Sequence, residues 1–103
     1  MNAQKLSDLI NYQEDAIVSR EILKQKNGNI TLFAFDKNQG LSKHQAPFDA
    51  FLYILEGDAE ITISEKVFKL KSGEEIIIPS QKPHSIKAKT RLKMLLIMIL
   101  GKK

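Results

Sequence analysis

Short runs with the two-residue period of β-strands follow one another closely from about residue 16 onward, and this pattern limits the fold more than any other feature. The clearest run is "DAEITISEKVFKLKSG", in which Ala59, Ile61 and Ile63 alternate with polar residues. The alternation resumes at Phe68 after a turn near Glu65. A hairpin with one buried face has this pattern, because successive side chains of a strand point to opposite sides.

Further strand-like runs lie at 16–23, 29–36, 50–57, 74–80, 84–89 and 91–100. The dipeptide Asn27-Gly28 predicts a turn between the first two runs. Only residues 5–12 suggest a short helix, with Ser7 as its cap. About eight short strands in 103 residues predict an all-β fold, either a closed barrel or a roll of two sheets.

Length and composition exclude several classes of protein. The 103 residues suffice for one domain, in which 1–28 form an N-terminal segment and strand and 29–100 form the barrel core. There is no cysteine, which excludes disulfides and thiolate metal sites. The N-terminus lacks the features of a signal peptide, and no apolar run is long enough for a membrane span. A cytoplasmic protein without membrane contact is expected.

Positive charge is concentrated near the C-terminus. All 12 acids lie at or before Glu75, whereas residues 76–103 contain seven bases and no acid. Lys87, Lys89, Arg91 and Lys93 alternate with small or apolar residues, which predicts a solvated strand face. An interaction module with a basic working face is the alternative. No aromatic residues are interleaved for base stacking, so no nucleic-acid partner is expected.

Two strands are apolar on both faces, at residues 50–55 and 94–100. One face of each belongs to the core, so the other must be covered. A short N-terminal element of the same chain could cover it, or a partner subunit could. Because an exposed "MLLIMIL" would aggregate, we favour a homodimer.

The segments "HQAPFDAFLYILEG" and "GEEIIIPSQKPH" resemble the two conserved motifs of the cupin family, small β-barrels of the jelly-roll type. The His, His, Glu and Gly positions of the first motif are occupied here by His44, Ala46, Ala50 and Gly57. The Gly, Pro, Gly, His and Asn positions of the second are occupied by Gly73, Pro79, Gln81, His84 and Ala88. The resemblance spans about residues 30–100 and implies the cupin jelly roll (double-stranded β-helix). "HQAPFDA" is similar to a subgroup of small bacterial cupins whose roles are mostly unassigned.

The resemblance also implies a degenerate metal site. In metal-dependent cupins, two His and one Glu of the first motif and the His of the second hold a divalent ion. This chain keeps His44 and His84 but has Ala46 and Ala50 at the other two places. Asp49 could supply a carboxylate only if a bulge near Pro47 turned it inward. Two imidazoles alone hold zinc, nickel or iron weakly, so at most a weakly bound metal is implied.

Replacing His and Glu by alanine removes atoms from the barrel interior. We therefore predict a pocket for a small organic ligand, such as one with a carboxylate or carbonyl group. Its residues would be His44, Ala46, Phe48, Ala50 and His84. Alternatively, bulky neighbours such as Phe33 or Phe35 fill the space, or the two imidazoles bond to each other, to water or to the backbone.

Three functions remain open from the sequence. The favoured one is a cupin that binds a small molecule without catalysis. The second is a metal-dependent enzyme such as a dioxygenase or isomerase, which the resemblance implies. The third is an interaction module that uses the basic face.

Overall fold

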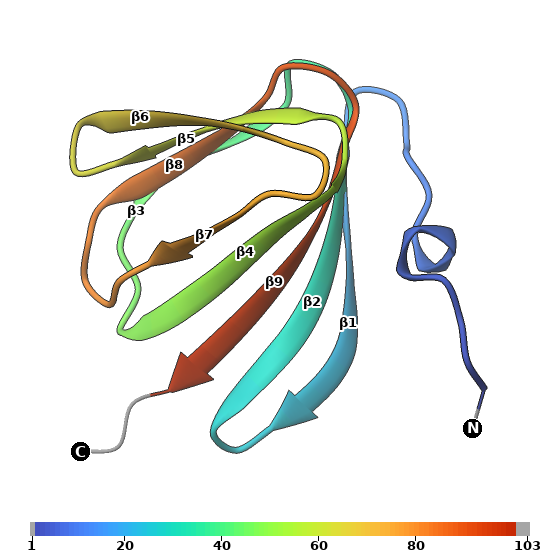
Figure 1. Cartoon of the computed structure of the whole chain (residues 1–103), viewed down its shortest axis with the longest axis horizontal. Helices are drawn as coiled ribbons and strands as arrows, with labels where there is room; N and C mark the ends of the chain where they lie inside the picture. Colours follow the sequence, from blue (N-terminus) through green and yellow to red (C-terminus); the bar gives the residue numbers. More distant parts are fainter. Residues whose placement is uncertain (1, 101–103) are drawn as a thin grey trace.

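The computed structural model describes residues 2–100, which form nine strands and one short 3₁₀ helix, η1 (Leu6–Leu9). The strands are β1 (Ile17–Gln25), β2 (Gly28–Phe35), β3 (Gly40–His44), β4 (Phe48–Glu56), β5 (Asp58–Ile63), β6 (Lys66–Lys71), β7 (Glu75–Ile78), β8 (His84–Ala88) and β9 (Leu92–Leu100). They make two antiparallel sheets, a large one in the order β1-β2-β9-β4-β7 and a small one in the order β3-β8-β5-β6 (Figure 1). The predicted all-β jelly roll is confirmed.

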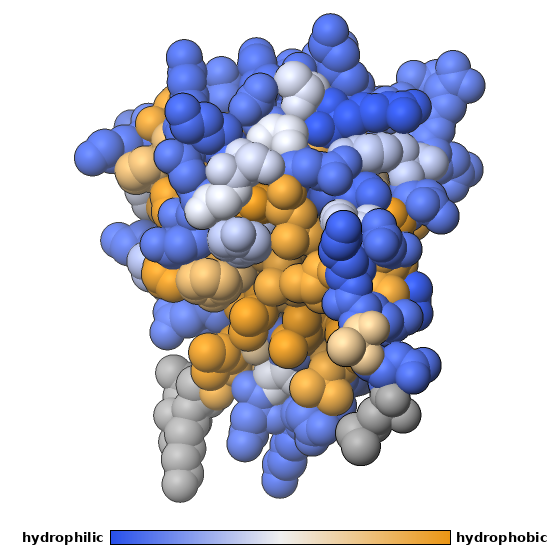
Figure 2. All heavy atoms as spheres, turned by 45° about the vertical axis from the view of Figure 1, so that its right-hand side comes forward, coloured by the Kyte–Doolittle hydropathy of each residue, from blue (hydrophilic) through white to orange (hydrophobic). Residues whose placement is uncertain are grey.

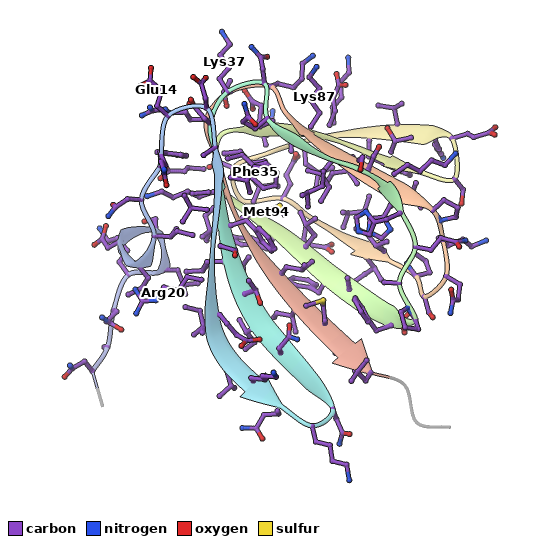
Figure 3. The ribbon with its side chains drawn as sticks, turned by 180° about the vertical axis from the view of Figure 1, so that it is seen from behind. Glu14, Arg20, Phe35, Lys37, Lys87 and Met94 are labelled. Atoms are coloured by element: carbon purple, nitrogen blue, oxygen red, sulfur yellow. The ribbon has the colours of Figure 1, made fainter. Side chains whose placement is uncertain are left out.

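The main core lies between the two sheets, where their apolar faces meet. Phe35 of β2 and Met94 of β9 are fully buried there (Figure 3). In the β5–β6 hairpin, Ala59 and Ile61 are buried while Glu60 between them is partly exposed. The alternation in the sequence therefore indicated correctly which face of this hairpin packs inward.

The positions of two hairpin turns were predicted from the sequence, one of them correctly and the other one residue away. Ser64 and Glu65 form the β5–β6 turn with φ angles of 46° and 74°, at the predicted place. In the first hairpin, Gln25 pairs with Gly28, so the turn lies one residue earlier than the predicted Asn27-Gly28.

Strand β3 was not among the predicted runs. Its sequence "GLSKH" has only one large apolar residue, Leu41, and most of the strand is exposed. As an edge strand it pairs only with β8. An exposed edge strand does not need apolar alternation, and this is why the pattern gave no signal for it.

The predicted helix is shorter than expected, and its cap was wrong. Helix η1 has Lys5 as its N-cap residue, with no side-chain cap hydrogen bond. Ser7 lies within the helix, where its carbonyl oxygen accepts a 2.6 Å hydrogen bond from Lys93 Nζ. A tertiary contact from β9 therefore holds this turn in place of a local cap.

The N-terminal segment covers part of the outer face of the large sheet, on the side away from the small sheet (Figure 1). Ile10 is buried there together with Leu32 and Ala34. The Tyr12 hydroxyl donates a 2.6 Å hydrogen bond to the Glu56 carboxylate. Burial, and secondarily this hydrogen bond, raise the pKa of Tyr12 well above its ordinary value, so the hydroxyl stays a donor at neutral pH.

The basic residues near the C-terminus do not form one solvated face. Lys87 points away from the molecule (Figure 3) and Lys89 lies 3.8 Å from the Glu60 carboxylate. Arg91 instead bonds Asp36, and Lys93 is only 9% exposed. The predicted solvated face therefore holds for Lys87, Lys89 and Arg91, which are exposed, and is wrong for Lys93, whose Nζ is hydrogen-bonded to the N-terminal segment. Within residues 2–100, no helix has the length and apolar character needed to cross a membrane.

Candidate functional site: the histidine pair

The two histidines of the chain meet in the small sheet. His44 ends β3, His84 begins β8, and they are directly opposed in the ladder between these strands. Their ring centroids are 4.2 Å apart with an interplanar angle of 60°. His84 is 9% exposed, whereas His44 is exposed. The pair therefore has one buried ring and one ring that solvent reaches.

An irregularity in β3 produces this pairing. Leu41 is opposite Ile86 and His44 is opposite His84, so Ser42 and Lys43 share the position facing Ser85. Two residues against one is the arrangement of a β-bulge, which re-aims the side chain that follows it. A bulge near Pro47 was the condition for an inward Asp49, whereas this irregularity lies upstream, within β3.

The backbone orients both rings in the same way. His44 Nδ1 lies 2.8 Å from the Ser42 carbonyl oxygen, and His84 Nδ1 lies 3.0 Å from the Lys82 carbonyl oxygen. A carbonyl oxygen only accepts hydrogen bonds, so each neutral ring carries its proton on Nδ1. In the described part of the chain, no hydrogen bond involves either Nε2. Each ring therefore keeps an unshared lone pair on Nε2.

Ala46 and Ala50, which occupy the two lost ligand positions of the motif, lie in different parts of the structure. Ala46 is in the connection between β3 and β4, where its carbonyl oxygen accepts a 2.8 Å hydrogen bond from the Gln81 amide. It therefore does not continue the strand face of His44, because β3 has already ended. Ala50 faces inward on β4 and is 6% exposed, packed in the main core. Phe48 begins β4 and is half-buried.

A hollow of about 130 Å³ reaches His84. The other residues of its lining are Lys43, Thr62, Glu65, Pro83 and Ser85. Neither the two alanines nor Phe48 belong to this lining, so the five residues predicted to share a pocket do not line this hollow together.

Asp49 is on the outer face of the large sheet. It pairs with Ile99 in a regular stretch of the β4–β9 ladder, whose only register shift lies between Ile54 and Glu56. Its Oδ1 accepts a 2.8 Å hydrogen bond from the Ser80 amide. The inward bulge on which its role as a metal ligand depended is absent from this ladder, so Asp49 instead stabilises the turn after β7.

The residues present do not fit a tightly bound metal ion. Across residues 2–100, no three side chains of His, Asp or Glu are grouped so that they could hold one. The pair supplies two neutral imidazoles and no carboxylate, whereas stable zinc or iron sites use three or more protein ligands.

Asn29 is a polar residue that the sequence analysis did not single out. Its Oδ1 is buried, without a hydrogen-bond partner among the described residues. It faces inward on β2, in the same row of the large sheet as Met98 and Ala50. The signal in the sequence is a polar residue at an inward position of "NITLFAF", and a buried unpaired acceptor is costly unless something donates to it.

The comparison with protein families decides the classification. A family model described as a cupin domain matches residues 31–100. The chain belongs to the cupin family. No curated protein matches this cupin.

Solved structures include similar chains. A conserved protein of unknown function from Streptococcus pyogenes has a TM-score of 0.93 and 30% identity, with 99% of this cupin and 90% of that chain covered. A cupin superfamily protein from Desulfitobacterium hafniense has a TM-score of 0.93 and 28% identity, over 97% of this cupin and 92% of that chain. A cupin 2 conserved barrel domain protein from Leptotrichia buccalis has a TM-score of 0.86 and 35% identity, over 90% of this cupin but 45% of that chain.

Proposed function

We propose that this cupin binds a small organic molecule at the His44–His84 pair and needs no tightly held metal to do so. The observation that carries the proposal is the shared orientation of the two rings, with each Nδ1 bonded to a backbone carbonyl. Both Nε2 lone pairs remain for a ligand, and the backbone bonds hold the rings in place before it arrives.

The ring orientation indicates the chemical class of the ligand. Because both neutral rings act as acceptors through Nε2, they favour a molecule with hydrogen-bond donors, such as an alcohol, a phenol or an amide N–H. This differs from the carboxylate or carbonyl expected from the sequence, which would require a donor on the ring. A ligand with two donor groups suits the two Nε2 acceptors best.

The test is a titration with a panel of small alcohols, phenols and amides, followed by NMR of the protein. Members that bind should shift the resonances of both histidine rings. His44→Phe keeps an aromatic ring on an exposed residue but removes the acceptor, so it should weaken binding at least tenfold. Lys87→Ala, on the outer side of the same sheet, is the matched control and should bind as the wild type does. Equal binding by His44→Phe and wild type would contradict the proposal.

The metal-dependent enzyme is the second candidate, and the metal content of the protein separates the two. Purified without added metal, this cupin should contain far less than one zinc, nickel or iron ion per chain. A near-stoichiometric content would favour the enzyme. The basic interaction face has less support, because Arg91 and Lys93 contact Tyr12 and the N-terminal segment.

A further inference from the structure

The outer faces of the two sheets differ in chemistry. Figure 2 views the molecule from the side of the large sheet and the N-terminal segment, where apolar side chains gather. The outer face of the small sheet is charged instead, and Lys87 points away from the molecule there (Figure 3). Its charged positions are two acids and four lysines, namely Asp58, Glu60, Lys69, Lys71, Lys87 and Lys89. A face with an excess of lysine attracts negatively charged partners.

The two acids form a column along β5, called the acid column below. Asp58 pairs with Lys71 and Glu60 pairs with Lys69 in the β5–β6 ladder. Because the buried Ala59 lies between the two acids in sequence, their side chains point outward together. Lys69 and Lys71 therefore form a lysine column on one side of the acid column.

A second lysine column lies on the other side of the acid column, at β8. Lys87 pairs with Glu60. Lys89 follows β8, and its amide donates a 3.0 Å hydrogen bond to the Asp58 carbonyl oxygen, so it continues the ladder beside Asp58. The acid column is thus flanked by two lysines on each side.

Most of these lysines have no acidic partner. Lys89 Nζ lies 3.8 Å from the Glu60 carboxylate, with the Lys89 side chain 48% exposed. Lys69, Lys71 and Lys87 are exposed and form no ion pair with any other residue in the range 2–100. Three ammonium groups on one face therefore remain for the carboxylates of a partner.

A shallow hollow lies on each side of the acid column. The hollow toward β6 has a volume of about 460 Å³ and includes Lys69 and Lys71 in its lining. The hollow toward β3 also has a volume of about 460 Å³ and includes Lys87 and Gly40. Glu60 lines both hollows. Gly40 pairs with Lys87 and has no side chain to cover it, so both lysine columns can be reached by the side chains of a partner.

We propose that the outer face of the small sheet binds an extended protein segment with a run of consecutive Asp or Glu residues. The segment lies over the acid column, parallel to β5, and its side chains point alternately to the two lysine columns. These columns are two strand spacings apart, about 9.6 Å, which leaves room for an extended backbone between them. Lysines within one column are two residues apart, about 6.6 Å, like the side chains on one side of an extended segment. Four consecutive acids then meet four lysines.

The acid column favours a peptide over other polyanions. When the side chains of an extended segment point to its two sides, its backbone N–H groups point at right angles to them, toward and away from the sheet. The carboxylates of Asp58 and Glu60 can accept hydrogen bonds from the N–H groups that face them. A DNA backbone has no donor for these carboxylates, and the outward positions of β3, β5, β6 and β8 hold no aromatic residue for base stacking.

This face is distinct from the basic run near the C-terminus, of which it contains only Lys87 and Lys89. It also does not involve the imidazole rings of the histidine pair. The proposal is therefore independent of the proposed function, and either one can fail without the other.

Fluorescence anisotropy with a labelled peptide of sequence GSEEEESG tests the proposal at low ionic strength. The wild type should bind the peptide saturably. The double variant Lys69→Ala, Lys87→Ala removes one ammonium group from each column and should bind about tenfold more weakly. The matched control Lys24→Ala, Lys26→Ala removes the same charge from exposed positions of the first hairpin and should bind as the wild type does. No saturable binding by the wild type, or equal binding by the two double variants, would overturn the proposal.

Two further probes test the chemical class of the partner. The same peptide with N-methylated glutamates keeps every carboxylate but lacks the backbone donors, so the wild type should bind it several-fold more weakly. A short single-stranded thymidine oligonucleotide should also bind more weakly than the peptide. Equal binding of the methylated peptide, or tighter binding of the oligonucleotide, would show that charge alone directs binding, and the proposed arrangement would be wrong.

Discussion

Asp36 joins three separate parts of the chain through one carboxylate. Its Oδ2 accepts a 2.7 Å hydrogen bond from the Asp15 amide, and its Oδ1 accepts bonds of 2.9 Å from the Lys37 amide and 3.0 Å from Arg91 Nε. The Asp15 amide first, and then the Arg91 side chain, hold the pKa of Asp36 below its ordinary value of 3.8. A single ionised group thus ties the start of β1 to the loop before β9.

The lowered pKa of Asp36 predicts an acid-sensitive stability. The folded state binds the proton of Asp36 less readily than the unfolded state, so its contribution is present above pH 3.8 and is lost as the pH falls through the folded-state pKa. Asp36→Asn should be less stable than wild type at pH 7 and should lose less stability between pH 5 and pH 2. Urea unfolding at several pH values measures both. If the unfolding free energies of wild type and Asp36→Asn changed with pH in the same way, this role for Asp36 would be contradicted.

At the scale of elements, the turns explain why the two conserved glycine positions of the motifs are kept. Gly57 between β4 and β5 has φ = +92°, and Gly73 before β7 has φ = +88°. A Cβ at Gly57 would also collide with the Arg91 carbonyl oxygen, whereas a Cβ at Gly73 would have no atom within 4 Å. Gln81 takes the third glycine position with φ = 67°, so a longer side chain is tolerated in this turn.

The two glycines make a matched pair of variants. Gly73→Ala should cost about 1 kcal/mol of unfolding free energy, the usual cost of a left-handed conformation for alanine. Gly57→Ala has the same backbone strain. Its Cβ must also displace the backbone at Arg91, in the loop between β8 and β9, which adds about 1–3 kcal/mol. Chemical denaturation of both variants measures the difference. Equal losses of unfolding free energy in the two variants would mean that the backbone at Arg91 moves aside at no cost, and would contradict this prediction.

At the scale of the whole molecule, the sequence was sufficient to predict the architecture, but it predicted the histidine site only in part. Strict alternation in residues 58–71 predicted a hairpin and its buried face, and the motifs predicted the family. The edge strand β3 could not be predicted, because an exposed strand has no apolar pattern. The outward position of Asp49 depends on where the β4–β9 ladder has its register shift, and the position of that shift could not be predicted from the sequence. The apolar outer faces of β4 and β9 predicted a cover, and the N-terminal segment covers one end of them; a partner subunit over the rest stays a prediction.

The histidine pair is also a property of the whole fold, because β3 and β8 are distant in sequence and adjacent only in the small sheet. The proposed function depends on the orientation of both rings by the backbone. Long-range ¹H–¹⁵N NMR at alkaline pH reports which ring nitrogen carries the proton, and the chain has only 2 histidines to assign. Both rings should carry the proton on Nδ1 and leave Nε2 bare. A proton on Nε2 of either ring would remove an acceptor from the site and contradict the account.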